Sequence, residues 1–163
     1  MKLYMEQKIF SFKEDFNVFD ENRNPVYHVE GNLFAFARQM RIYDASTQEE
    51  LAFIKQKYFA FLQTLEIFRH GQLEGSVKQR LNLLKPQYEI NHLGWRVEGN
   101  FFGYDYQIID PDGYLIADIN RKFWSFTDAF EINIYDDEDY PVDPVMVMAI
   151  VIAIDVSKDS SKS

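Results

Sequence analysis

Short runs of alternating apolar and polar residues fill the first third of the chain and predict β-strands. The predicted strands cover Leu3–Phe12, Phe16–Phe19 and Val26–Glu30. A polar turn, Asp20–Pro25, separates the last two, and Gly31-Asn32 ends the third. Gly, Asn, Asp and Pro are the residue types that reverse a chain, so this segment predicts a β-meander.

The next segment carries two conflicting signals. Ser46-Thr47-Gln48-Glu49 matches the capping box that begins helices, and apolar residues follow it at near-helical spacing from Leu51 to Phe68. Taken alone, the stretch predicts a helix. A comparison with a second copy of the same pattern predicts a strand over Glu50–Lys57 instead, and the helical spacing is then a coincidence in an apolar-rich segment.

That second copy is an internal repeat relating residues 29–69 to residues 97–135. The hexapeptide Val29-Glu30-Gly31-Asn32-Leu33-Phe34 recurs as Val97-Glu98-Gly99-Asn100-Phe101-Phe102, Tyr43-Asp44 aligns with Ile109-Asp110, and Lys57–Phe61 aligns with Lys122–Phe126. In the second copy the turn signal Asp110-Pro111-Asp112-Gly113 replaces the capping box, and alternating Leu115, Ala117 and Ile119 follow as in a strand. Two halves with one plan are typical of a duplicated supersecondary unit.

The rest of the chain adds strands without a domain boundary. Gly71–Gln79 and Pro86–Ile90 are predicted strands on either side of a linker, Arg80–Lys85, and the second copy ends at residues 131–135. No segment rich in Pro, Gly or Ser separates the copies, so we predict one domain over residues 1–156. Residues 157–163 are polar and are expected to form a frayed tail.

Near the C-terminus, Val145–Ile154 is an unbroken apolar run. Asp143 followed by Pro144 is typical of a helix N-cap and first helical position, whereas the many Val and Ile residues leave a strand as the alternative. A helix of this length measures about 15 Å, half of the roughly 30 Å of a bilayer core. Because the run has no polar face, we predict a helix over about residues 144–156 that is enclosed by a curved antiparallel sheet.

Composition supports a mainly β fold and narrows the function. The chain has 163 residues, and aromatic residues make up 17% of them, which favours strands. Its net charge of −9 argues against nucleic-acid binding, which needs a positive surface. There is no Cys, so disulfides and thiolate metal sites are excluded. The N-terminal sequence lacks the apolar region of a signal peptide, and we expect an intracellular, cytoplasmic protein.

These features together resemble a known family. The order of strands, the two Val-Glu-Gly-Asn elements, the Ile109–Gly113 turn and the closing segment Ala149–Asp155 are similar to the LURP-one-related family of the Tubby C-terminal-like superfamily, which includes phospholipid scramblases. The resemblance covers nearly the whole chain. It implies a closed antiparallel β-barrel of two similar halves around a hydrophobic C-terminal helix.

Candidate chemistry is sparse. His28-Val29-Glu30 matches half of a zinc deaminase signature whose Cys pair is missing, and His70 and His92 lack metal-ligand spacing. No nucleophile elbow or phosphate-binding glycine motif occurs. We therefore assign no catalytic, cofactor-binding or metal-binding residue and expect no cofactor.

Two groups of charged residues could bind a ligand or could have purely structural roles. The acidic segment Asp136-Asp137-Glu138-Asp139, with Asp143, raises the question of calcium over residues 136–143, although Pro141 and Val147 stand where a helix-loop-helix calcium site needs Gly and Glu. Basic residues cluster at Arg38 with Arg41, Lys55 with Lys57, Lys78 with Arg80, and Arg121 with Lys122. In Tubby domains basic side chains on the barrel exterior hold phosphoinositide head groups, but outward charges also keep a barrel soluble.

The sequence thus favours a non-catalytic, intracellular Tubby-like barrel that binds a phospholipid, a membrane surface or a protein partner. Two alternatives stay open: a scramblase-like membrane-associated protein, and an enzyme or small-ligand binder with an unrecognised site in the barrel mouth.

Overall fold

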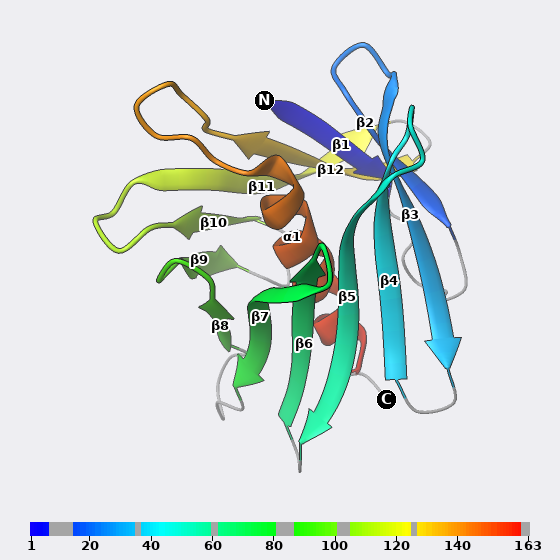
Figure 1. Ribbon diagram of the computed structural model, residues 1–163. Coiled ribbons are helices and arrows are strands. Elements are labelled where there is room, and N and C mark those ends of the chain that lie inside the picture. The colour runs from blue at the N-terminus through cyan, green and yellow to red at the C-terminus, as the bar shows by residue number, and fades with distance from the viewer. Residues whose placement is uncertain are drawn as a thin grey trace.

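The computed structural model describes residues 1–6, 15–34, 37–59, 62–80, 87–100, 105–124 and 127–160. These segments form a closed, antiparallel β-barrel of twelve strands around one C-terminal helix, as expected from the sequence (Figure 1). The elements in chain order are β1 (Lys2–Glu6), β2 (Phe16–Phe19), β3 (Pro25–Phe34), β4 (Ala37–Asp44), β5 (Glu50–Phe59), β6 (Leu62–Arg69), β7 (Gln72–Arg80), β8 (Gln87–Asn91), β9 (Arg96–Asn100), β10 (Asp105–Ile109), β11 (Leu115–Trp124), β12 (Thr127–Ile134) and α1 (Pro144–Ser160).

Neighbouring strands along the chain pair with each other, and the first and last strands close the ring. β1 pairs with β12 over five residues, from Lys2 opposite Asn133 to Glu6 opposite Ala129. On its other edge β1 pairs with β2 at Tyr4 opposite Phe19 and at the adjacent residue pair. Closure leaves no open sheet edge at this junction and curves the sheet enough to enclose α1.

The segment with conflicting signals is a strand. β5 covers Glu50–Phe59 and pairs with β4 and β6, which confirms the strand predicted over Glu50–Lys57. Its inward residues Ala52 and Ile54 are at most 1% exposed. Pairing on both edges overrides the local helical spacing, because a barrel strand satisfies its backbone hydrogen bonds across the sheet.

Several predicted strand ends are wrong. β3 continues through Gly31 and Asn32 to Phe34, because these residues lie opposite residues of β4 in the antiparallel ladder. β7 begins at Gln72 rather than Gly71, since His70 (φ 48°) and Gly71 (φ 75°) form the left-handed turn of a two-residue hairpin. The predicted strand beyond Glu6 and the linker residues after Arg80 lie outside the described residues.

The two predicted copies coincide with β3–β6 and β9–β12. At matching positions, a carboxylate stands at the end of the second strand of each copy and accepts hydrogen bonds from the turn. Asp44 Oδ1 accepts the N–H groups of Ser46 and Thr47, both at 2.8 Å. Asp110 Oδ1 accepts those of Asp112 at 2.9 Å and Tyr114 at 2.8 Å. The same turn chemistry therefore stands at corresponding places in both halves.

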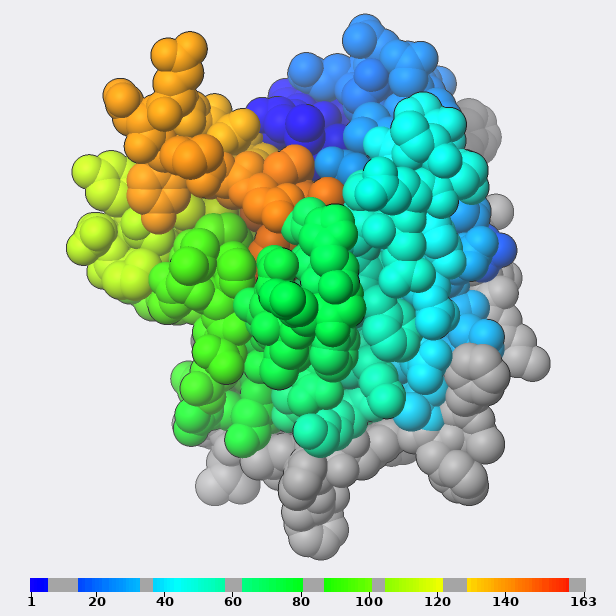
Figure 2. Space-filling view, in the orientation of Figure 1, coloured from blue at the N-terminus to red at the C-terminus, as the bar shows by residue number. Residues whose placement is uncertain are grey.

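The apolar run is the core of the barrel. α1 begins at Pro144, one residue after Asp143, whose Oδ1 accepts the N–H of Val145 at 2.9 Å as an N-cap does. Residues Met146 to Ile154 are at most 2% exposed, and the strands β5–β7 lie in front of the helix in the space-filling view (Figure 2). Among the described residues no helix is long and apolar enough to cross a membrane.

The predicted end of the helix at about residue 156 is wrong. α1 continues to Ser160, and Ser157 and Lys158 are buried rather than part of a frayed tail. The Ser157 hydroxyl donates to the Ala153 carbonyl at 2.8 Å. Lys158 Nζ lies 5.3 Å from the centre of the Tyr106 ring, a cation–π distance. Ser157 thus has its partner within α1, and Lys158 has a partner on β10.

Candidate functional site

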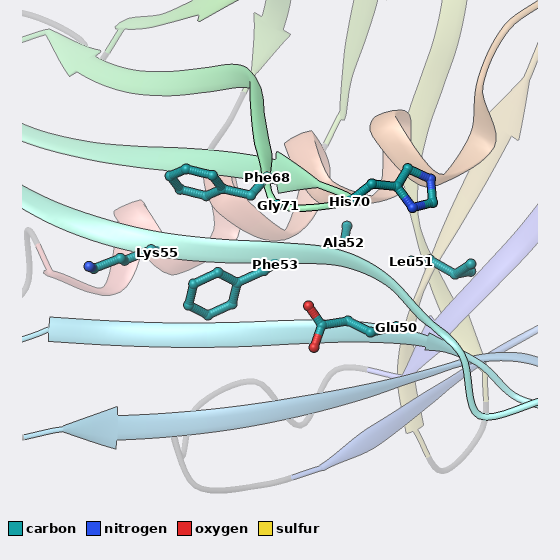
Figure 3. Close-up of a pocket in the computed structure, with 8 residues that line it drawn as sticks. All are labelled: Glu50, Leu51, Ala52, Phe53, Lys55, Phe68, His70 and Gly71. Carbon is teal, nitrogen blue, oxygen red and sulfur yellow. The ribbon is translucent and has the colours of Figure 1, made fainter.

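A shallow groove crosses the outer wall of the barrel at one end of β5 and β6 (Figure 3). Its volume is about 340 Å³. The residues that line it come from β5, from β6 and from the turn that follows β6: Glu50, Leu51, Ala52, Phe53, Lys55, Phe68, His70 and Gly71. The groove is open to solvent, and α1 lies on the opposite side of the sheet.

Two phenylalanines form the apolar part of the groove. Phe53 and Phe68 are directly opposite each other on β5 and β6, and their ring centres are 6.1 Å apart with the planes at 36°. Figure 3 shows the rings side by side on neighbouring strands. They point outward because the alternate positions, such as Ile54 and Ile67, fill the core. Cross-strand aromatic pairs contribute about 0.5–1.5 kcal/mol beyond burial, and both rings remain partly exposed to water.

The pair belongs to a longer row that crosses four strands. Leu73 on β7 lies opposite Phe68 and is 57% exposed. On the other side, the Arg41 guanidinium of β4 lies 4.4 Å from the centre of the Phe53 ring. Arg41 Nε also donates to Glu50 Oε2 at 3.1 Å. We call Arg41, Phe53, Phe68 and Leu73 the outer row.

Lysines flank the outer row on the side toward the middle of the strands. Lys55 is the next outward residue after Phe53 and is exposed. Lys57 follows it, and its Nζ donates to Glu66 Oε1 at 3.2 Å. On β7, Lys78 is half-buried and lies opposite Thr64 and Glu89. Arg80 Nε donates to Glu89 Oε2 at 2.6 Å.

The segment that builds this wall is less acidic than the rest of the chain. Residues 37–80 contain seven Lys and Arg against five Asp and Glu, a net charge of +2. The remaining residues contain ten Lys and Arg against twenty-one Asp and Glu, a net charge of −11, which together gives the −9 of the whole chain. The charge of the protein is therefore unevenly distributed along the chain, and the groove lies in its less acidic part.

The structure separates the predicted basic pairs. Lys55, Lys57, Lys78 and Arg80 share the outer wall of β5–β7, and Arg41 joins them on β4. Arg38, by contrast, reaches inward, where its Nη1 donates to the Val156 carbonyl of α1 at 2.8 Å. Arg121 follows the inward position of Ile119 by two residues and also points inward. The side chain of Lys122 lies outside the described residues.

The histidines do not converge. His28 Nδ1 lies 2.9 Å from Asn17 Oδ1, and its ring is stacked on Tyr43. His92 Nδ1 lies 3.0 Å from the carbonyl oxygen of Glu74, and only His70 borders the groove. Over the part of the chain that the structure describes, no three His, Asp or Glu side chains form a group that could hold a metal ion.

The acidic loop of residues 136–143 uses its carboxylates to fix its own backbone. Asp137 Oδ1 accepts the N–H groups of Asp139 at 2.9 Å and Tyr140 at 2.7 Å. Asp136 Oδ1 accepts the N–H of Val142 at 2.8 Å. Carboxylates engaged in this way position the entry to the helix, which gives the acidic segment a structural role.

Asp143 and Asp110 anchor this loop to the barrel. Asp143 forms an ion pair with Arg69 of β6 in addition to capping α1. The Tyr140 hydroxyl donates to Asp110 Oδ2 at 2.7 Å. That hydrogen bond is the main reason why the pKa of Asp110 lies below its usual value, and it raises the pKa of Tyr140.

The outer row was not predicted. Phe53 and Phe68 lie in the apolar-rich segment, where their neighbours Ala52, Ile54 and Ile67 are apolar as well and no outward side stands out. Once the segment is known to be a strand, a large apolar residue on the outward side is the signal that would have marked them.

The fold defines the class of protein: a closed antiparallel barrel built around a buried C-terminal helix, with a shallow groove on its outer wall. The chain belongs to the LURP-one-related family, whose sequence model matches residues 1–155; this confirms the resemblance found in the sequence. It is similar to the uncharacterized protein YxjI of Bacillus subtilis (strain 168), with 28% identity over 156 residues, which is 96% of this chain and 93% of that protein.

Among solved structures, the chain is similar to the X-ray structure of the protein AT5G01750 from Arabidopsis thaliana. The TM-score is 0.66 with 18% sequence identity, and the match covers 96% of this chain and 91% of the other. At this level of identity the likeness concerns the fold.

Proposed function

We propose that this protein is a non-catalytic binding module that docks on anionic phospholipid surfaces through the outer wall of β4–β7. The observation that carries the proposal is the outer row itself, in which Leu73 is exposed and Phe53 and Phe68 are partly exposed in a groove beside Lys55 and Lys78. Monomeric proteins rarely leave such a stripe uncovered without a binding role.

The chemistry of the wall matches a lipid interface. Phe53, Phe68 and Leu73 offer apolar side chains that can enter the head-group region, and the lysine stems can lie along the apolar surface while their ammonium groups reach phosphates. Each Lys near an anionic membrane contributes about 1 kcal/mol. Because the rest of the chain is strongly negative, this sector sets the orientation on the membrane.

The proposed setting is cytoplasmic, as the sequence led us to expect. The cytoplasmic leaflet carries the anionic phospholipids that this wall would contact. The apolar helix that raised the scramblase-like alternative is enclosed by the barrel, and no observation favours that alternative over surface binding.

Vesicle co-sedimentation tests the proposal. The full chain should sediment with vesicles of phosphatidylcholine and phosphatidylserine but not with phosphatidylcholine alone, and the bound fraction should fall as salt is added. The double variant Lys55→Gln/Lys78→Gln should bind about 30-fold more weakly, the equivalent of about 2 kcal/mol.

The matched control is Lys2→Gln, which removes one Lys from β1, five positions away from β6 around the barrel. It should bind like the parent. A lack of sedimentation with anionic vesicles at low salt would overturn the proposal, and so would an equal loss in the Lys2 control. A protein partner that competes for the wall would then become the working hypothesis.

A further inference from the structure

Three connections at one end of the barrel carry large exposed side chains. They are the turn between β8 and β9, the turn between β10 and β11, and the loop that joins β12 to α1. Figure 1 shows the last two projecting from the same side of the barrel, and they adjoin on the surface in Figure 2. Leu93 is 71% exposed and Tyr114 is 63% exposed. We call Leu93, Pro111, Tyr114 and Tyr140 the tyrosine face.

Direct contacts join the three connections into one surface. The rings of Tyr114 and Tyr140 are stacked, with their centres 5.6 Å apart and their planes at 25°. Gly94, next to Leu93, lies against the ring of Pro111, because a Cβ on this glycine would be 2.7 Å from Pro111 Cγ. The tyrosine face is therefore continuous from the turn after β8 to the loop before α1.

A single buried carboxylate holds both tyrosines in place. Asp110 is 2% exposed. Its Oδ1 accepts the backbone N–H of Tyr114 at 2.8 Å, and its Oδ2 accepts the hydroxyl of Tyr140 at 2.7 Å. A Tyr side chain has few rotatable bonds, and a ring that is already fixed loses little entropy when a partner binds. Rigid aromatic residues of this kind often dominate the energy of an interface.

The turn chemistry does not require an aromatic residue at this place. In the first copy Asp44 Oδ1 accepts the N–H groups of Ser46 and Thr47 in the corresponding turn, and residues 45–49 include no aromatic residue. The same kind of turn thus forms without a stacked pair of rings. Exposed Tyr is typical of protein interfaces, so Tyr114 indicates a contact outside the chain.

The charges around the tyrosine face select a cationic partner. Residues 97–120 contain five Asp and Glu and no Lys or Arg, and residues 123–157 contain eight and none. Among these carboxylates, Asp112 belongs to the turn after β10 and Glu138 and Asp139 belong to the loop after β12, and all three are exposed. The electrostatic field at this end of the barrel therefore attracts positive charge.

Other charged groups here are already engaged within the chain. Asp136 and Asp137 accept backbone N–H groups of their own loop. Arg96, at the border of the face, donates from Nη1 to the Asp110 carbonyl at 3.2 Å and from Nε to Glu98 Oε1 at 3.0 Å. The surface offered to a partner thus consists of aromatic and apolar side chains beside exposed carboxylates.

We propose that the tyrosine face binds an arginine-bearing segment of a partner protein. A guanidinium group stacks on aromatic rings and pairs with a carboxylate through two parallel hydrogen bonds, so Tyr114 and the exposed carboxylates suit it together. Leu93 and Pro111 contact the apolar parts of the segment. Negative charge beside the rings disfavours nucleic acid and anionic lipid at this surface.

This surface is separate from the wall of the proposed membrane function. β11 and β5 are six strands apart in the ring of twelve, so they lie on opposite sides of the barrel. The proposal therefore does not depend on lipid binding. If both functions hold, the protein links a basic partner to an anionic membrane, with one contact on each side.

Fluorescence polarisation with the full chain tests the proposal. The probe is a fluorescein-labelled peptide of alternating Arg and Gly, and the comparison peptides carry Lys or Glu in place of Arg. The Arg peptide should bind saturably, and its affinity should fall as salt is added. The Lys peptide should bind about threefold more weakly or worse, because an ammonium group has no planar face, and the Glu peptide should not bind. No saturable binding of the Arg peptide at low salt would overturn the proposal, and so would equal affinity for the Arg and Lys peptides.

Variants locate the contact. Tyr114→Ala should weaken binding of the Arg peptide about two- to fivefold, as expected for an exposed cation–π contact, whereas Tyr114→Phe should bind like the parent because the ring is kept. Asp112→Asn/Glu138→Gln should weaken binding about three- to tenfold. The matched control Glu49→Gln/Glu74→Gln removes two exposed carboxylates from the β5–β7 side and should bind like the parent. Unchanged binding by Tyr114→Ala, or an equal loss in the control, would show that the tyrosine face is not the site.

Discussion

Replacing Ile152 by Ala tests the central claim about the core. Ile152 lies in the middle of α1, is 0% exposed, and is surrounded by strands on every side. The change removes three carbon atoms, each contributing about 0.8 kcal/mol of transfer free energy, or about 2.4 kcal/mol together. A cavity term adds to this because a closed barrel cannot collapse onto the space, and the total loss should be about 2–5 kcal/mol.

Urea unfolding measures this loss. Trp95 is 4% exposed, so its fluorescence reports on the folded core. With a slope near 2 kcal/mol/M, the midpoint should fall by about 1 to 2.5 M without a change in the slope. Leu73→Ala, on the outer wall, is the matched control and should stay within about 0.5 kcal/mol of the parent.

The harsher change Ile150→Asp should prevent folding, because an unpaired carboxylate in this core costs several kcal/mol, comparable with the roughly 5–15 kcal/mol that hold a domain together. Near-ultraviolet circular dichroism should lose its tertiary signal. If Ile152→Ala unfolds at the parental midpoint, or if Ile150→Asp melts like the parent, the helix is not the buried core.

Three further predictions follow from turns and close contacts. Gly99→Ala should lower the free energy of unfolding by about 2–5 kcal/mol, because its Cβ would lie 2.6 Å from the Asp105 carbonyl oxygen at a φ of 125°. Gly71→Ala, whose Cβ would have no atom within 4 Å, should lower it by about 1–2 kcal/mol in the same urea assay. Equal losses of stability in the two variants would contradict the close contact at Gly99. Tyr140→Phe should raise the pKa of Asp110 toward its ordinary value, seen by carboxyl ¹³C NMR titration; an unchanged pKa would refute the role of the hydroxyl. Hydrogen bonds, chiefly from the Ser46 hydroxyl, lower the pKa of Asp44 to about 2. The contribution of Asp44 to stability is therefore present above about pH 4 and is lost as the pH falls toward 2. Asp44→Asn should remove this part of the acid sensitivity of the urea midpoint, and an unaltered pH dependence would contradict the prediction.

Local signals were sufficient for most elements but misleading at their ends. The pattern Asp143-Pro144 located the start of α1 because an N-cap acts within one turn. The end of α1 was missed, since Ser157 and Lys158 read as a polar tail. Lys158 is buried against Tyr106, which is far away in the sequence, and no local pattern contains that contact.

The candidate sites show the same division. The basic pairs were visible in the sequence, but one-residue steps along a strand separate inside from outside, so Arg38 faces the helix while Lys55 faces solvent. Phe53 and Phe68 become a surface pair only because the register of β5 and β6 sets them opposite each other. Composition shows neither the face of the sheet on which a residue lies nor the register between neighbouring strands.

The sequence by itself determined that Val145–Ile154 must be buried, that strands dominate, and that two halves share one plan, because apolar burial and turn chemistry act locally and apply to any fold of this chain. The tertiary structure decided which polar residues enter the barrel and which apolar residues remain outside. The physical reason is the closure of the barrel. Once β1 pairs with β12, each residue of a strand points either into the barrel or out to solvent, and residues from five separate strands meet around the end of the helix.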